Sequence, residues 1–161
     1  MQRQKGFSLI ELLIVVAIIL IIAAIAIPNL LRARIAANES SAVGSIRTIN
    51  TAMISYNSEY PTVGYAANLS VMGGTCTGTT VPTTTSACLI DSTLAAGTKS
   101  GYTFKAVGSG GPPSGIYDVY ANPVSANSSG VRSFCSVQDA VIRVAGTSSV
   151  STCAGTETPL Q

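Results

Sequence analysis

"KGFSLIELLIVVAIILIIAAIAIPNLL" (residues 5–31) begins with a lysine and then runs almost entirely apolar. From Leu12 to Ile27, sixteen residues pass without one polar side chain, and counted from Phe7 the run reaches twenty-one residues. A helix of that length measures about 32 Å at roughly 1.5 Å per residue, enough to cross the hydrocarbon core of a bilayer. We therefore predict a membrane-spanning helix over residues 7–27.

Two basic residues, Arg3 and Lys5, precede the apolar run. They predict a cytoplasmic N-terminus, with everything after Pro28 on the other side of the membrane. A cleaved secretory signal peptide is an alternative, because Ala24-Ile25-Ala26 has the small residues of a cleavage site. The apolar region of such a peptide has about 7 to 15 residues, fewer than the apolar run here. This alternative also leaves Glu11 unexplained.

The order Lys5-Gly6-Phe7-Ser8-Leu9-Ile10-Glu11-Leu12 resembles the prepilin-type cleavage and methylation motif of type IV pilins and type II secretion pseudopilins. The resemblance implies a bacterial precursor whose leader, residues 1–6, is removed after Gly6 by a prepilin peptidase. It also implies that the new N-terminal Phe7 is methylated. The precursor would lie in the inner membrane with its head in the periplasm, and assembly machinery would polymerise it into an extracellular pilus serving adhesion and motility.

Glu11 is the one charged side chain inside the apolar run. A lone carboxylate in lipid costs about 2.5 to 3.5 kcal/mol on insertion scales, so we expect it to have a partner. Leader removal creates one, the cationic amine of Phe7, and we expect the amine of one chain to meet Glu11 of its neighbour. Two alternatives are that Glu11 favours the positive end of the helix dipole or pairs with Phe7 of its own chain.

Pro28 predicts a kink, because proline lacks the backbone donor and crowds the carbonyl of Ala24. The helix is expected to resume as an amphipathic segment over residues 28–60 and to end near Tyr60, before Pro61. Its polar interruption is at Asn38 and Glu39. The apolar positions recur at near-heptad spacing and need a surface to lie against: Leu31, Ile35, Ala42, Ile46, Ile49, Met53, Tyr56 and Tyr60.

Residues 61–161 predict a globular head, divided into a loop (61–101), a β-sheet (102–145) and a C-terminal tail (146–161). The loop is rich in Gly, Thr and Ser, with a possible short helix around Cys88–Leu94. Four segments have strand composition, and Gln138 and Asp139 predict a hairpin between the last two: Tyr102–Val107, Ile116–Ala121, Val131–Ser136 and Ala140–Val144. The expected fold is α+β, a long N-terminal helix packed against an antiparallel sheet of about four strands.

The four cysteines, Cys76, Cys88, Cys135 and Cys153, all lie in the head. An even number beyond a membrane segment favours two disulfides in an oxidising compartment, and buried free thiols are the alternative. Three pairings are possible. We favour Cys76 with Cys88 and Cys135 with Cys153, because each closes a short loop.

The composition argues against an enzyme. The chain has no His, which is both the commonest general base and the commonest metal ligand, and it has no Trp. No CxxC pair, calcium loop or phosphate loop is present, so we expect no metal site, no cofactor and no catalytic residue. Beyond the leader, seven basic residues balance seven acidic ones without forming a run, so we do not expect nucleic acid as a partner.

Three functions fit these observations. The first is a structural subunit of a type IV pilus, a homo-oligomer built through its N-terminal helix. The second is a pseudopilin of a type II secretion system. The third is a membrane-anchored module that binds a ligand or DNA and never polymerises.

Overall fold

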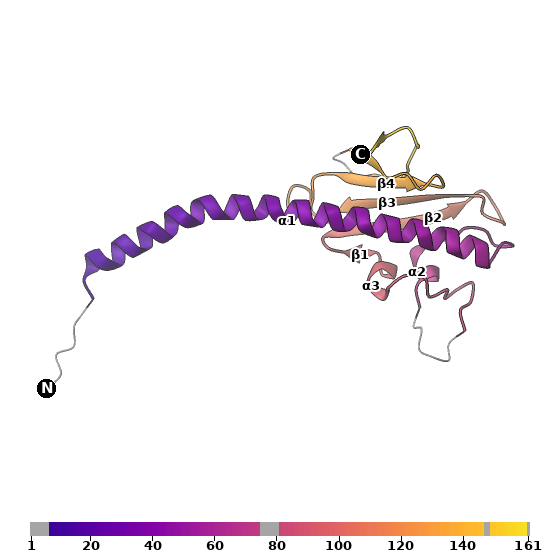
Figure 1. The fold of residues 1–161 in the computed structure, drawn as a ribbon, viewed down its shortest axis with the longest axis horizontal. Helices are drawn as coiled ribbons and strands as arrows, with labels where there is room; N and C mark the ends of the chain where they lie inside the picture. The colour runs from indigo at the N-terminus through magenta and orange to yellow at the C-terminus, as the bar shows by residue number, and fades with distance from the viewer. Residues whose placement is uncertain (1–6, 75–80, 147–148, 161) are drawn as a thin grey trace. The chain divides into compact units, whose positions relative to one another are not determined.

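The computed structural model describes residues 7–74, 81–146 and 149–160. The chain divides into two compact units, Met1–Arg34 and Ile35–Gln161. The first unit consists of the apolar part of the long helix, and the second contains the rest of that helix and the sheet (Figure 1).

The long helix, α1, is Leu9–Glu59. Its end agrees with the prediction to one residue, and Pro61 cannot continue it because proline has no backbone N–H. The helix α1 continues through Pro28, so the proline does not end it. The kink expected there stays a prediction.

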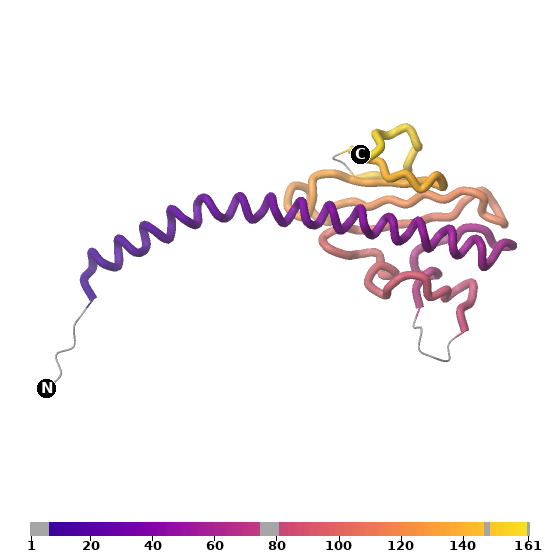
Figure 2. Tube along the Cα trace, viewed as in Figure 1, coloured from indigo at the N-terminus to yellow at the C-terminus, as the bar shows by residue number. Residues whose placement is uncertain are grey.

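A six-stranded antiparallel meander forms the sheet of the second unit, with the strands in chain order from β1 to β6 (Figure 2). The strands β2 and β3 are the longest and pair along their whole length. The bounds are β1 Thr98–Lys99, β2 Tyr102–Ser109, β3 Ile116–Pro123, β4 Ser133–Val137, β5 Arg143–Gly146 and β6 Thr158–Pro159.

The core lies between one face of this sheet and the second part of α1. From Tyr102 to Val107 on β2, buried and exposed residues alternate, the pattern of a strand with one face on a core. The predicted helix stripe is confirmed from Ala42 to Tyr56, whereas Leu31 is exposed and Ile35 is half-buried. The largest core side chains are Ile46, Ile49, Met53, Tyr56, Met72, Leu94, Tyr102, Tyr117, Val119 and Phe134.

One buried polar side chain of α1 is built into this core. Asn50 donates from Nδ2 to Ser136 Oγ (2.9 Å) and accepts at Oδ1 from the hydroxyl of Tyr117 (3.4 Å). Burial raises the pKa of Tyr117 to about 12, so its hydroxyl keeps the proton that it donates. Because a buried amide without partners is costly, these bonds fix the position of α1 along the sheet.

The structure adds short elements that the sequence did not predict. The strands β1 and β6 have two residues each, and the four-residue helix α2, Leu69–Met72, lies in the segment expected to be an irregular loop. The possible helix near Cys88–Leu94 is α3, Ser92–Ala95, and it begins after Asp91, whose Oδ1 accepts from the N–H of Leu94 at 2.8 Å.

The predicted hairpin between the last two strands is confirmed, because β4 pairs antiparallel with β5. The strand β4 ends at Val137 and β5 begins at Arg143, so five residues connect them. Ala140 within this connection has φ 58°, and the carboxylate of Asp139 binds the N–H of Val141 and the side chain of Arg143. The connection therefore contains an ion pair and a left-handed residue, neither of which the sequence predicted.

The C-terminal tail covers the opposite face of the sheet. Tyr120 and Cys135 are register partners on that face, and both cluster with Cys153. The predicted disulfide Cys135–Cys153 is confirmed, with a Cα–Cα distance of 5.7 Å. Cys88 is also disulfide-bonded, and its predicted partner, Cys76, lies outside the described residues.

Asn122 binds the tail at a second position. Its side-chain amide donates to the carbonyl of Val150 and its Oδ1 accepts from the N–H of the same residue, both at 2.8 Å. This pair of bonds imitates the pairing of two strands at a single position.

We expect the C135S/C153S variant to unfold at a lower urea concentration, with about 3 kcal/mol less stability, because the cross-link closes a loop of this length in the unfolded chain. The two cysteines are 18 residues apart in sequence. The measurement is a urea unfolding curve. The exposed tail pair in S151A/T152A is the matched control, and equal midpoints for both double variants would contradict the role of the cross-link.

Candidate functional site

The start of α1 carries the motif residues. Phe7 is 80% exposed, and the first helical residue is Leu9. The backbone N–H of Ser8 donates to Oε2 of Glu11 at 2.8 Å. Ser8 and Glu11 stand at the spacing of a capping box, in which the carboxylate reaches back to satisfy an N–H that has no partner inside the helix.

This geometry determines which carboxylate oxygen of Glu11 can accept a further hydrogen bond. Its carboxylate lies in the first turn, where the helix dipole favours negative charge. Within the described part of the chain only Oε2 has a hydrogen-bond partner, so Oε1 is open to a donor from outside the chain. This position is compatible with the helix-dipole interpretation, and that interpretation and the intersubunit pairing both stay predictions.

The apolar helix around this motif has no protein cover. The helix α1 is long and apolar enough to cross a membrane, and its most apolar stretch is not buried in the structure. The large side chains from Phe7 to Leu31 are exposed throughout. A surface of this size needs lipid or other protein chains to cover it.

A buried carboxylate in the second unit connects α1 to the sheet, and the sequence did not single it out. Glu39, expected as a polar interruption, is only 7% exposed. Its Oε1 accepts from the N–H groups of Val131 and Arg132, both at 3.0 Å, and its Oε2 accepts from Nε of Arg132 at 2.8 Å. Nη2 of Arg132 lies 2.7 Å from the same oxygen, so two nitrogens of the guanidinium contact Oε2.

The neighbours of Glu39 make further contacts with the loops of the head. Asn38 donates to the carbonyl of Ser129 at 2.8 Å, and the hydroxyls of Ser41 and Ser100 lie 2.9 Å apart. The guanidinium of Arg132 also lies 5.4 Å from the ring centre of Phe134, within cation–π range. This part of α1 therefore fixes two loops of the sheet. The polar residues that interrupt the hydrophobic stripe make these specific contacts.

Glu39 is charged in the folded state. Burial alone raises the pKa of its carboxyl, but the Arg132 guanidinium and the N–H groups of Val131 and Arg132 outweigh burial and hold the pKa below its usual value. A carboxylate with four donors around it resists protonation until the solution is acidic.

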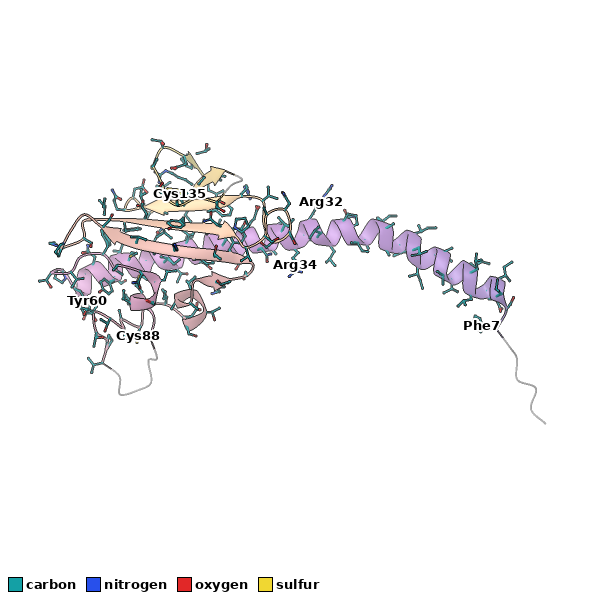
Figure 3. The ribbon with its side chains drawn as sticks, turned by 180° about the vertical axis from the view of Figure 1, so that it is seen from behind. Phe7, Arg32, Arg34, Tyr60, Cys88 and Cys135 are labelled. Carbon is teal, nitrogen blue, oxygen red and sulfur yellow. A yellow bond between two sulfur atoms is a disulfide. The ribbon has the colours of Figure 1, made fainter. Side chains whose placement is uncertain are left out.

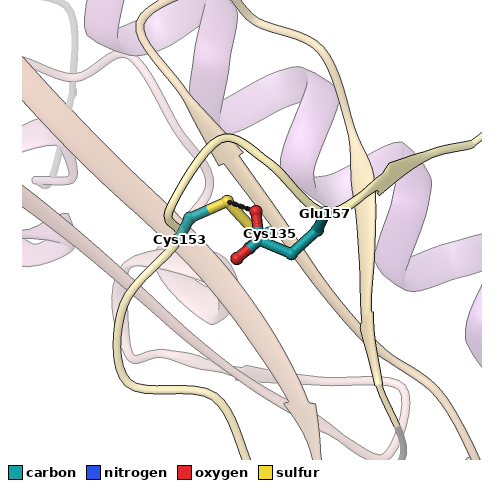
Figure 4. Close-up of side chains that lie close together, drawn as sticks. All are labelled: Cys135, Cys153 and Glu157. Atoms are coloured by element: carbon teal, nitrogen blue, oxygen red, sulfur yellow. Dashed lines mark hydrogen bonds between the residues drawn. A yellow bond between two sulfur atoms is a disulfide. The ribbon is translucent and has the colours of Figure 1, made fainter.

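Among the described residues one group has the composition of a metal site: Cys135, Cys153 and Glu157 (Figure 4). The two sulfur atoms are joined in the disulfide, so neither is a thiolate that could bind a metal. The carboxylate of Glu157 instead accepts from the N–H of Ala154 at 2.9 Å. This cluster is structural, because its disulfide cross-links the tail to β4.

The predicted site residues are divided between the two units. Phe7, Glu11 and Pro28 belong to the first unit, whereas Cys88, Cys135 and Cys153 belong to the second. Figure 3 labels Phe7, Cys88 and Cys135. Gly6 and Cys76 lie outside the described residues. Within the described part of the chain, the functional candidate is the exposed start of α1.

An exposed apolar N-terminal helix with an α+β head of antiparallel strands defines a class of protein, the pilin-like subunit. A model for the prokaryotic N-terminal methylation motif matches residues 1–27. By this match and the relatives described next, the chain is similar to type IV pilins and type II secretion pseudopilins.

Three relatives illustrate the similarity. The chain is 49% identical to the type IV major pilin protein PilA of Myxococcus xanthus over 57 residues, 35% of this chain and 26% of that protein. It is 65% identical to the type IV wide pilus major component PilA4 of Thermus thermophilus over 40 residues, 25% of this chain and 30% of that protein. It is 35% identical to type II secretion system core protein G of Klebsiella pneumoniae over 65 residues, 38% of this chain and 46% of that protein.

These alignments span less than half the length of each relative. No solved structure matched the chain. Most of the chain lies outside each alignment, so the head is analysed from its own residues.

We expect E39Q to lower the stability of the head by about 1 to 3 kcal/mol, because the amide keeps the shape but loses the charge that Arg132 faces. Since the folded-state pKa of Glu39 is lowered, its contribution is present above the unfolded-state pKa of about 4.3 and is lost as the pH falls through the folded-state value. Urea unfolding at neutral pH and near pH 3 measures both effects.

The matched control for this prediction is E59Q, at an exposed carboxylate of the same helix. The difference between wild type and E39Q is expected to shrink in acid, while E59Q follows wild type at both pH values. A difference that is independent of pH would contradict the ionic role of Glu39.

Proposed function

We propose that the chain is the structural subunit of a type IV pilus. A prepilin peptidase removes residues 1–6, Phe7 is N-methylated, and the mature chain waits in the inner membrane with its head in the periplasm. Assembly machinery then extracts it into an extracellular filament. The chain itself performs no catalysis in this process.

The observation that carries the proposal is the uncovered apolar helix with one carboxylate in its first turn. The exposed side chains from Phe7 to Leu31 fit a lipid environment in the precursor and a bundle of identical helices in a filament. The amine of Phe7 keeps its positive charge after methylation. It is the donor that we assign to Oε1 of Glu11 in the neighbouring subunit.

Charge pairing sets the register between subunits in this proposal. Contacts between apolar helices are nearly non-directional, so many relative positions have similar energy. An ammonium and a carboxylate enclosed by apolar side chains attract strongly only at close range, and each is costly if left unpaired. One position along the neighbouring helix is therefore favoured.

A pseudopilin of a type II secretion system is the second candidate. The specific observation in its favour is the longer alignment with core protein G, which covers 38% of the chain against 35% and 25% for the two pilus proteins. Electron microscopy of cells with labelled protein separates the two functions, because long surface filaments carrying the label support a pilus.

We expect E11A to reduce filament mass at least about tenfold, since the Phe7 ammonium of the neighbouring subunit then lacks its partner in a water-poor environment. Leader cleavage is expected to continue, because Glu11 lies outside the Gly6–Phe7 bond. Sheared filaments and the membrane fraction are measured by immunoblotting. E59A, at the exposed other end of α1, is the control, and wild-type amounts of filament from E11A would remove the pairing from the proposal.

The mature N-terminus provides an independent check. Mass spectrometry of the filament protein is expected to show a chain beginning at methylated Phe7. A chain that still begins at Met1, or one that begins at Ile27 after signal-peptide cleavage, would rule out both the pilus and the pseudopilus.

A further inference from the structure

Two basic residues follow the apolar segment at its end distal to Glu11. Arg32 and Arg34 come directly after Leu31 in α1, and both are exposed. They are two residues apart on a helix, so their directions differ by about 200°. Figure 3 shows them on opposite sides of the helix. Neither side chain has a hydrogen bond or an ion pair with any other described residue.

The distance from this basic pair to Glu11 matches a bilayer. Twenty-one positions separate Glu11 from Arg32 in one helix assignment, which corresponds to about 32 Å, and the hydrocarbon core is about 30 Å thick. Asn29 is the only hydrogen-bonding side chain between them. Charged groups thus bracket the apolar segment at the spacing of the two membrane boundaries.

We propose that Arg32 and Arg34 bind lipid phosphates at the outer boundary of the membrane and set the depth of α1. The inference rests on the membrane-spanning role proposed above. Guanidinium groups bind phosphate through two parallel N–H bonds, and long side chains at a helix end reach toward the headgroups. Because the two arginines point to opposite sides, they contact different lipids and resist both tilting and sliding of the helix.

This depth has a consequence for Glu11. With Arg32 at the outer phosphates, Glu11 lies at the inner boundary, where water reaches its carboxylate and the Ser8 N–H already binds it. The stored subunit therefore does not hold a charge inside lipid. The carboxylate becomes enclosed only when the helix leaves the membrane, where the amine of the neighbouring chain is available.

The depth can be measured because the chain contains no Trp. A single Trp is placed in turn at Val16, Leu20 and Ala24 of the full chain, in an R3Q/K5Q background that leaves Arg32 and Arg34 as the basic pair beside the span. The protein is reconstituted in phosphatidylcholine–phosphatidylglycerol vesicles with bromine at the acyl-chain ends. Quenching is expected to be strongest at Leu20, about 18 Å from Arg32 along the helix.

In R32Q/R34Q we expect the strongest quenching to move to Ala24, a shift of about 6 Å, because the helix slides until Glu11 is better hydrated. R32K/R34K is expected to keep the maximum at Leu20, since lysine also binds phosphate. The matched control is R47Q/K105Q, which removes two positive charges from exposed positions of the head and is expected to leave the profile unchanged.

Two results would overturn the inference: a maximum that stays at Leu20 in R32Q/R34Q, and an equal shift in R47Q/K105Q. In both cases the membrane span itself would stand. Weak and equal quenching at all three positions in the parent chain would instead show that the helix does not cross the bilayer, and the proposed function would then fail as well.

Discussion

An apolar helix that its own chain does not cover is the constraint on which the rest of the structure depends. The side chains from Phe7 to Leu31 have no core to enter, so their burial requires lipid or further copies of the chain. The remaining part of the same helix does have a core to enter. There the apolar stripe from Ala42 to Tyr56 packs on one face of the sheet. A single element thus serves two environments, and the change between them occurs within a few residues of Arg34.

Polar contacts give this head its specificity, because apolar packing alone would allow the helix to slide along the sheet. Glu39 binds the start of the segment that leads into β4, and Asn50 binds β4 itself through Ser136. On the other face, Asn122 and the Cys135–Cys153 disulfide hold the tail. The helix and the tail are therefore fixed to the same central strands from opposite sides.

The sequence predicts those features that depend on local composition. The apolar run predicted a helix, which begins at Leu9, and the β-branched and aromatic composition predicted four of the strands. Glu39 was missed because its partners are more than ninety residues away, and a charge beside an apolar stripe looks the same whether it is solvated or bound. The strands β1 and β6 were missed because two residues carry no pattern. The hairpin after Val137 was predicted, but its ion pair between Asp139 and Arg143 was not, because that contact depends on the folded geometry.

The two short outer strands limit how copies of the head can associate. A long unpaired strand invites a second sheet to join it by backbone hydrogen bonds, and proteins avoid this with short edges, lysine and proline. Among the described residues, one edge of this sheet is Thr98–Lys99 and the other is Thr158–Pro159, whose proline has no N–H to donate. Growth by strand addition is thereby discouraged at both margins. Copies of the head therefore have few free backbone groups through which their sheets could join edge to edge.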